Sequence, residues 1–339
     1  MREMNAHSIE PERIGATTAV YITIDTEYEA GFTARHGLDS RRANFRRSIA
    51  CETPDGTAGV GYQLDVFDAN DLKAVFFVDP MPALVWGVEA ISDVVGPIVA
   101  RGHDVQLHLH TEWLALAGTR SPLPGIIGDN LKDFGFDEQC RLIDYARSTL
   151  IAAGAPAPIA FRAGNYGAND DTLRALAKLG LAYDTSHCPG IAGSACAIGL
   201  GAEDRAPVAR RGVIEVPVGC IGDMLHGRRH AQLTALSAAE LISGISHARD
   251  SGSASFTLVS HSFELLSRDR ARINRVVRRR FERFCAGLAA LDGVTSATYA
   301  ARPPVAEAAG GRVALAPAAP LRQARRMAEQ AVANLLYGY

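Results

Sequence analysis

The sequence predicts an α/β protein, an irregular (β/α) barrel with a C-terminal helical tail, on three observations. Short apolar strands alternate with amphipathic helices along most of the chain, which is typical of a parallel sheet wrapped by helices. The number of strand–helix units suits a barrel, complete or irregular, better than two Rossmann halves. No G-x-G-x-x-G motif follows the first strand, which argues against dinucleotide binding.

The first half of the chain begins with a strand that ends at a carboxylate, Ala19–Asp25. The polar stretch Tyr28–Gly56 that follows is too long for an ordinary connection, so a functional loop is expected there. The next expected elements are a helix whose face carries Val60, Leu64 and Phe67, the strand Lys73–Val78, a helix near Ala90–Ala100 and the strand His103–His110.

The second half continues the alternation. Its expected elements are a helix from about Asp137 to Ala153, the strand Ile159–Arg162, the helix Asp171–Leu179, the strands Leu181–Asp184, Val213–Val216 and Phe256–Ser260, and the helix Ala271–Leu291. The predicted helix Ala271–Leu291 carries six arginines, which are Arg272, Arg275, Arg278, Arg279, Arg280 and Arg283. This pattern indicates a solvated polar face or, as the alternative, a patch that makes peripheral contact with an anionic membrane.

Shifts in composition divide the chain into four segments. Residues 1–17 form an N-terminal extension and residues 18–300 form the barrel domain. Residues 301–320 are an Ala/Pro-rich linker, and residues 321–339 are expected to form a C-terminal helix that docks on the body or on a partner.

Composition excludes several classes of protein. Of the 339 residues, 47% are hydrophobic and 21% charged, so disorder over most of the chain is excluded. The net charge of −2 gives no reason to expect a nucleic-acid partner, and no apolar run is long enough to span a membrane. The N-terminus has no apolar signal segment, and the six cysteines are scattered as expected for reduced thiols. A cytoplasmic location is expected; the sequence does not indicate the oligomeric state.

Residues able to carry out a reaction gather where the predicted strands end. They are Asp25 and Glu27 on the first strand, His108 and His110 on a middle strand with Glu112 just beyond, Arg162 on the next, and His261 on the last. In a parallel α/β barrel, functional groups lie at the carboxyl ends of strands. Carboxylates and imidazoles gathered at one such edge have the composition of a metal hydrolase.

The spacing of these residues leaves two ligand sets open. In an extended strand, residues two apart point to the same face, so His108 and His110 can both meet one cation. If the chain turns into a helix at His108, then His108 and Glu112 share a face instead. Asp25 and Glu27 obey the two-residue rule, so one carboxylate can bind a cation while the other accepts a proton. A histidine opposite, whose ordinary pKa is about 6.5, can protonate a leaving amine.

Six segments in order resemble the polysaccharide deacetylase family, carbohydrate esterase family 4, with its NodB-homology domain. They are ITIDTEYE, AVFFVDP, GHDVQLHLHTEW, FRAGNYG, LGLAYDTSH and LVSHSFELL, and together they span about Thr18 to Leu266. The resemblance implies an irregular (β/α) barrel that removes N- or O-acetyl groups from sugars, with one divalent metal ion, expected to be Zn²⁺.

The resemblance also implies roles for individual residues. Asp25 matches the general base, His108 the first metal-binding histidine, and His261 the general acid. Arg162 matches the arginine that orients the base, and Tyr166 the residue whose backbone N–H helps to bind the oxyanion.

The sequence departs from the family pattern in three motifs. Thr26 stands where the family has a metal-binding aspartate, and Glu27 is the nearest substitute. The second metal-binding histidine would fall at Glu112, so either Glu112 or His110 takes its place; we favour His110, because imidazole suits zinc and the strand geometry fits. Gly164 and Asn165 replace prolines of the third motif.

The sequence therefore predicts a metal-dependent deacetylase of an acetylated amino sugar, in polysaccharide or glycoconjugate biosynthesis. The basic residues of Tyr28–Gly56, Arg46 and Arg47 among them, suggest a phosphate-bearing substrate held by an arginine. One alternative is a metal-dependent hydrolase of another C–N bond, of the ureide or imide type. The other is a non-catalytic sugar-binding module with a degenerate metal site.

Overall fold

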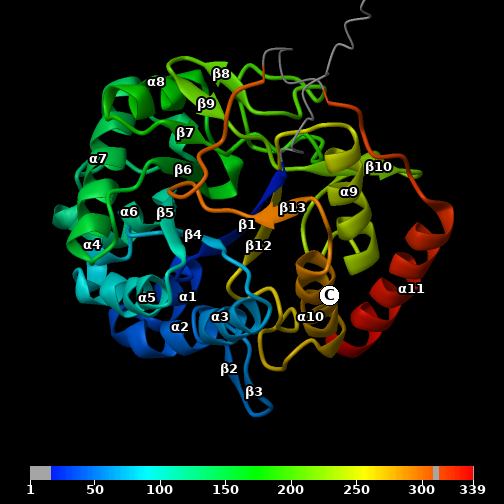
Figure 1. Cartoon of the computed structure of the whole chain (residues 1–339). Coiled ribbons are helices and arrows are strands. Elements are labelled where there is room, and N and C mark those ends of the chain that lie inside the picture. The colour runs from blue at the N-terminus through cyan, green and yellow to red at the C-terminus, as the bar shows by residue number, and fades with distance from the viewer. Residues whose placement is uncertain (1–16, 308–312, 339) are drawn as a thin grey trace, which may run out of the picture.

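The computed structural model describes residues 17–307 and 313–338, and its centre is a nine-stranded sheet (Figure 1). Along the sheet the strand order is β12-β1-β4-β5-β6-β7-β9-β8, and β13 also pairs with β1. The strands are β1 (Thr18–Thr26), β4 (Val75–Val78), β5 (Asp104–Leu109), β6 (Ala160–Ala163), β7 (Tyr183–Asp184), β8 (Val208–Arg210), β9 (Val213–Glu215), β12 (Ser255–His261) and β13 (Val294–Ser296).

The sheet curls but does not close. All its pairs are parallel except β8 with β9, and β12 and β8 stand at opposite ends of the order. The predicted irregular (β/α) barrel is therefore confirmed, in the form of an open half-barrel. Two small hairpins lie outside it, β2 (Glu52–Thr53) with β3 (Gly56–Thr57) and β10 (Cys220–Asp223) with β11 (Gly227–His230).

Helices surround the sheet (Figure 1). They are α1 (Ala30–His36), α2 (Arg41–Ser48), α3 (Val60–Ala69), α4 (Ala83–Trp86), α5 (Glu89–Ala100), α6 (Leu114–Ala117), α7 (Phe136–Ala152), α8 (Asp170–Lys178), α9 (Ala238–Asp250), α10 (Arg275–Ala289) and α11 (Pro320–Tyr337). Within residues 17–307 and 313–338, no helix has the length and apolarity that a bilayer span requires.

The two faces of β1 explain how the site is positioned. All nine residues of β1 are buried, because both faces of the strand are covered. Val20, Ile22 and Ile24 join the large cluster that also includes apolar residues of the helices, whereas Tyr21 packs with Phe77 and Tyr299 in a smaller cluster on the other face. Since side chains alternate, Thr23 and Asp25 share the face of Tyr21. On this face of β1, the side chains therefore change from apolar at Tyr21 to charged at Asp25.

The stretch Tyr28–Gly56 is not the loop that the sequence predicts, because α1 and α2 occupy much of it. The fully buried residues of the two helices are polar: Thr33, Asn44 and Ser48. The buried Asn44 side chain donates to the Glu29 carbonyl (2.8 Å) and to Thr33 Oγ1 (3.0 Å), and accepts from the Glu29 N–H (3.0 Å). With a polar buried side, these helices lack the apolar period that marks a helix in a sequence.

The C-terminal part contains the predicted elements in the predicted order, but helix α9 and the strands β10, β11 and β13 were not predicted from the sequence. The predicted helix Ala271–Leu291 is α10, which begins only at Arg275 because Asn274 caps it by accepting from two backbone N–H groups. The predicted terminal helix is α11. The boundaries proposed at residues 300 and 320 remain predictions, and most of the N-terminal extension lies outside the described residues.

Candidate metal centre and active site

Asp25 and Arg162 form a buried ion pair at the carboxyl ends of β1 and β6. Arg162 is fully buried, and its Nη1 donates to Asp25 Oδ1 (2.6 Å) and to Thr23 Oγ1 (2.9 Å). Its Nε donates to the Thr185 carbonyl (3.2 Å), and its guanidinium lies over the Phe77 ring. With so many contacts the guanidinium has one position, and it fixes the orientation of the Asp25 carboxylate.

Glu27, His108 and His110 meet beside this pair. One ligand atom from each lies within 4.8 Å of the others. Glu27 Oε2 is 3.1 Å from His108 Nε2 and 3.4 Å from His110 Nε2. The chain remains extended through His110 (φ −106°, ψ 124°) and only then enters a 3-10 turn, Thr111–Trp113. His108 and His110 therefore share a strand face, and of the two geometries that the sequence allows, the structure has the strand.

Each histidine of this cluster is oriented by a second contact on its other ring nitrogen. His108 Nδ1 lies 2.8 Å from the Arg162 carbonyl, which can only accept, so Nδ1 carries the proton and Nε2 is free to bind a cation. His110 Nδ1 lies 3.0 Å from Glu112 Oε2, and Asn165 donates to the same carboxylate (3.3 Å). Glu112 therefore contacts His110 from outside the cluster.

Gly164 leaves the space that the His110 ring fills. A Cβ at this position would lie 2.7 Å from His110 Nδ1 and 2.8 Å from two of its ring carbons. No residue with a side chain fits there unless His110 moves. Glycine at position 164 thus leaves the space that a histidine at position 110 needs.

Glu27 and His110 are strongly coupled by their charges. Burial alone would raise the pKa of Glu27, but the His110 and His108 imidazoles outweigh it and hold that pKa well below its ordinary value. Burial would lower the pKa of His110, but Glu27 and Glu112 outweigh it and raise that pKa well above its ordinary value. The negative charges of Glu27 and Glu112 thus favour the protonated, positively charged form of His110.

The cluster fits a divalent cation. Glu27 Oε2 is buried and has no hydrogen-bond partner among the described residues. The three ligand atoms of Glu27, His108 and His110 lie close enough together to bind one cation. Two imidazole nitrogens and one carboxylate oxygen are a ligand set that suits zinc and leaves room for a further ligand.

His261 lies across from this cluster on the neighbouring strand. In the register of β1 with β12, His261 is the partner of Asp25. Burial would lower the pKa of His261, but the carboxylate of Glu264, together with Asp25 and Glu27, raises it to about 9. His261 is therefore protonated at neutral pH, as a general acid must be.

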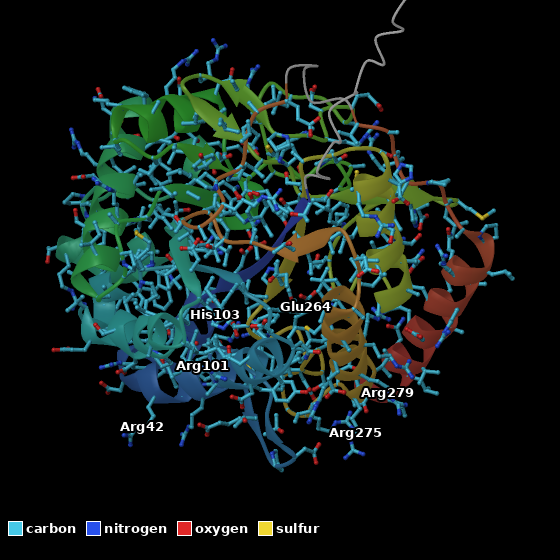
Figure 2. All side chains as sticks on the ribbon, viewed as in Figure 1. Arg42, Arg101, His103, Glu264, Arg275 and Arg279 are labelled. Carbon is cyan, nitrogen blue, oxygen red and sulfur yellow. The ribbon has the colours of Figure 1, made fainter. Side chains whose placement is uncertain are left out.

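Glu264 was not predicted from the sequence to belong to the site; it is buried, and it lies near the centre of the view in Figure 2. Its carboxylate accepts hydrogen bonds from Gln232 Nε2 (2.7 Å), from Thr234 and from the His261 backbone N–H (3.1 Å). Burial opposes its ionisation, but His261 and these donors lower the pKa of Glu264 to about 2. The sequence held one signal that could have identified Glu264, namely that it follows the strand-ending His261 by three positions.

Asp79, for which the sequence predicted no role, also adjoins the cluster. Its Oδ1 accepts from the backbone N–H groups of Met81 (3.0 Å) and His110 (3.4 Å). Its Oδ2 is buried without a hydrogen-bond partner among the described residues. Burial outweighs the His110 and His108 charges and raises the pKa of Asp79 to about 7.

Tyr166 stands on a strained turn after β6. Asn165 and Tyr166 both have positive φ, 55° and 58°, although neither is glycine. Such conformations cost about 1–3 kcal/mol each and cluster at functional sites. The Tyr166 ring packs against Cys188, Val218 and Val259, which hold the turn in place.

A cleft of about 160 Å³ opens beside the cluster. Its lining includes Glu27, His110 and Glu112 of the site, the aromatic residues Tyr28, Trp113 and Phe263, and Arg270. Arg270 lies over the Phe263 ring and pairs with Glu29 (3.2 Å). The cleft gives a small molecule access to the cluster between aromatic walls.

Solved structures of known proteins match almost the whole chain. A protein from Mycobacterium smegmatis, assigned as a polysaccharide deacetylase, is 19% identical with a TM-score of 0.52, and the match covers 88% of this chain and 93% of that one. The chain has the polysaccharide deacetylase fold. The fold that the resemblance implies is thereby confirmed.

Two further matches have lower TM-scores. A family 4 carbohydrate esterase from Streptomyces lividans in complex with acetate is 14% identical (TM-score 0.40), with 88% of this chain and 98% of that one covered. The catalytic domain of a peptidoglycan N-acetylglucosamine deacetylase from Eubacterium rectale is 11% identical (TM-score 0.41), with 89% and 96% covered. No family model and no curated protein matches the sequence.

Proposed function

We propose that this polysaccharide deacetylase fold carries a metal-dependent hydrolase that removes an N-acetyl group from an amino sugar or sugar conjugate. One observation carries the proposal. The Glu27, His108 and His110 cluster, the Asp25–Arg162 pair and His261 occupy neighbouring strand ends. A cation site, a base with a fixed orientation and a protonated acid are the groups that hydrolysis of an amide requires.

Each residue has a role in the proposed reaction. Glu27, His108 and His110 would hold a divalent cation, expected to be Zn²⁺, which polarises the acetyl carbonyl and makes water more acidic. Asp25, oriented by Arg162, takes the proton from the attacking water. The backbone N–H of Tyr166 donates to the developing oxyanion. His261 then gives its proton to the nitrogen of the departing amine.

The test is release of acetate from a panel of N-acetylated sugars by the purified protein loaded with zinc or cobalt. The panel includes free, oligomeric and nucleotide-linked N-acetylglucosamine, and the free amine is measured alongside acetate. The proposal predicts equal amounts of both products from at least one sugar. Opening of a cyclic ureide or imide without acetate release would favour the other C–N hydrolase. Sugar binding with no bound metal and no turnover would favour the binding module.

The phosphate-bearing substrate remains a prediction. Arg47, one of the two expected clamp residues, pairs with Glu29 (3.3 Å) and donates to the Asp269 carbonyl. Arg46 is exposed and forms no hydrogen bond or ion pair with any described residue. Arg46 is therefore the more suitable residue for holding an anion, and the nucleotide-linked sugar in the panel tests whether the substrate carries one. The cytoplasmic location likewise remains a prediction.

Glu264→Gln is expected to shift the alkaline limb of the pH profile of kcat/KM to lower pH. Because His261 must be protonated to act as the acid, the rate falls as the pH rises through its pKa of about 9. Without the Glu264 charge, burial dominates and the pKa of His261 falls. The exposed Asp55→Asn in the β2–β3 hairpin removes one negative charge elsewhere and should leave the limb in place. An unchanged limb in Glu264→Gln would show that Glu264 does not raise the pKa of the catalytic acid.

A further inference from the structure

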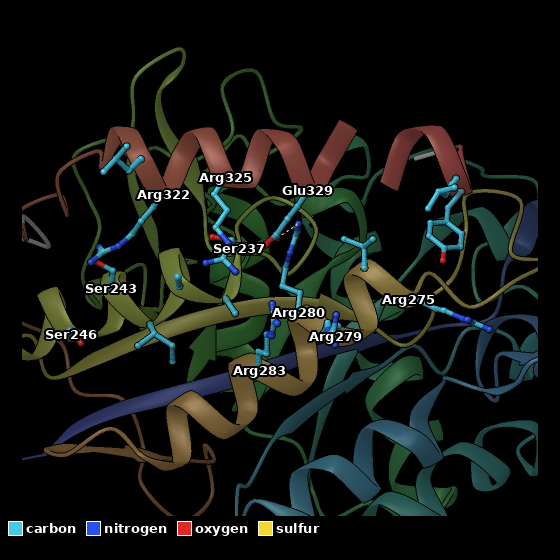
Figure 3. Close-up of a pocket in the computed structure, with 17 residues that line it drawn as sticks. Ser237, Ser243, Ser246, Arg275, Arg279, Arg280, Arg283, Arg322, Arg325 and Glu329 are labelled. Carbon is cyan, nitrogen blue, oxygen red and sulfur yellow. Dashed lines mark hydrogen bonds and ion pairs between the residues drawn. The ribbon is translucent and has the colours of Figure 1, made fainter. Parts of the chain in front are cut away.

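A large groove rich in arginine lies between α9, α10 and α11, and its volume is about 1110 Å³ (Figure 3). None of the residues proposed for the reaction lines it. The arginines that line it are Arg275, Arg279, Arg280 and Arg283 of α10 and Arg322 and Arg325 of α11. Among the described residues, Glu329 of α11 is the one acid in its lining.

The groove exists because α11 is fixed on the body of the protein. Arg326 is buried and pairs with Asp223 (2.7 Å) and Glu240 (3.1 Å), both of which are also buried. Gln323 accepts a hydrogen bond from the Met224 backbone N–H (3.0 Å). These contacts hold α11 at a defined distance from α10, so the arginines of the two helices face a common space (Figure 3).

The positive charge in the groove is not balanced by the protein. Glu329 is shared between Arg280 (3.3 Å) and Arg325 (3.5 Å). No hydrogen bond or ion pair is formed by the side chains of Arg279 and Arg283 with any described residue, and Arg279 reaches the rim of the molecule (Figure 2). Arg322 contacts Ser243 Oγ (2.5 Å), which carries no charge.

A buried, incompletely paired arginine forms part of the wall. Arg280 is 3% exposed, and its Nε has no hydrogen-bond partner among the described residues. Its Nη1 donates to the Leu233 carbonyl (2.8 Å), and its Nη2 reaches Glu329. A guanidinium buried with one shared carboxylate is stabilised by further negative charge nearby.

We propose that this groove binds a ligand that carries two or more phosphate groups close together. Guanidinium groups bind phosphate oxygens through paired, charge-assisted hydrogen bonds. The arginines come from two facing helices across a space much larger than one phosphate, so adjacent phosphates can be held from both sides. A soluble diphosphate and the headgroups of an anionic bilayer present the same groups. Because Leu321 and Leu335 of α11 are 87% and 86% exposed, the test includes both sources.

The first arm of the test is calorimetric titration of the full chain with inorganic pyrophosphate. Arg279→Ala/Arg325→Ala removes one charge from each wall and is expected to weaken binding about 10-fold or more. Arg280 is left unchanged, because it also donates to the Leu233 carbonyl. The next residue, Thr234, donates to Glu264, so a change at Arg280 could disturb the proposed active site. The matched control Arg141→Ala/Arg147→Ala removes two arginines of α7 that form no hydrogen bond or ion pair with any described residue, and it should bind as the wild type does.

The second arm is sedimentation with phosphatidylglycerol vesicles, with phosphatidylcholine vesicles for comparison. Binding of pyrophosphate without vesicle binding assigns the groove to a soluble ligand. Vesicle binding that Arg279→Ala/Arg325→Ala removes assigns it to lipid headgroups. Binding of neither probe would overturn the proposal, as would equal loss in the α7 control. Since neither arm requires turnover, the result is independent of the proposed deacetylase activity.

Discussion

Asp25→Asn is expected to lower kcat for acetate release by about 10²–10⁴-fold, the usual contribution of a general base. Asparagine has the same size, and its Oδ1 can still accept from Arg162, whose contacts fix the geometry. What the variant loses is the ability to take a proton from water. Because Asp25 is outside the Glu27, His108 and His110 cluster, bound metal should be largely retained.

The measurement compares the rate of acetate release with the metal content of the same sample. Asp65→Asn, a surface carboxylate that pairs with Arg101, serves as the control and should leave both unchanged. An Asp25→Asn protein that holds metal and keeps more than about one hundredth of the wild-type rate would show that another group is the base.

His110→Ala is expected to reduce zinc affinity by several orders of magnitude, and Glu112→Ala by only about 10–100-fold. His110 presents Nε2 to the point where Glu27 and His108 converge, whereas Glu112 contacts the opposite nitrogen of the same ring. Competition with a chelator measures both affinities. Greater metal loss in Glu112→Ala than in His110→Ala would make Glu112 the ligand.

Two further measurements test the same geometry. Gly164→Ala should weaken zinc binding because its Cβ would displace the His110 ring, whereas Gly61→Ala, which has open space around it, should not. The raised pKa of His110 also gives a sign for the pH dependence. A proton on His110 competes with the cation, so zinc affinity should fall as the pH is lowered and protons should be released on binding.

The sequence by itself determined the fold class and the edge at which the chemistry lies. The apolar runs that end in Asp25, His108 and Arg162 are sufficient to predict that these residues lie close together. Parallel strands with helical connections must bring their carboxyl ends to one edge of the sheet. The helices α1 and α2 were not predicted, because their buried side is formed by polar residues such as Asn44. Apolar periodicity cannot reveal a helix that is held by hydrogen bonds.

Only the tertiary structure decided how the histidines and acids pair. The spacing of His108, His110 and Glu112 is compatible with a strand or a helix, and the choice depends on β5 staying extended and on the space that Gly164 leaves, more than 50 residues away in the chain. Nothing in the sequence distinguishes Glu264 and Asp79 from other acidic residues. The fold lowers the pKa of Glu264 by placing His261 beside it and raises the pKa of Asp79 by removing water from it. Both effects depend on distance in space and not on position in the chain.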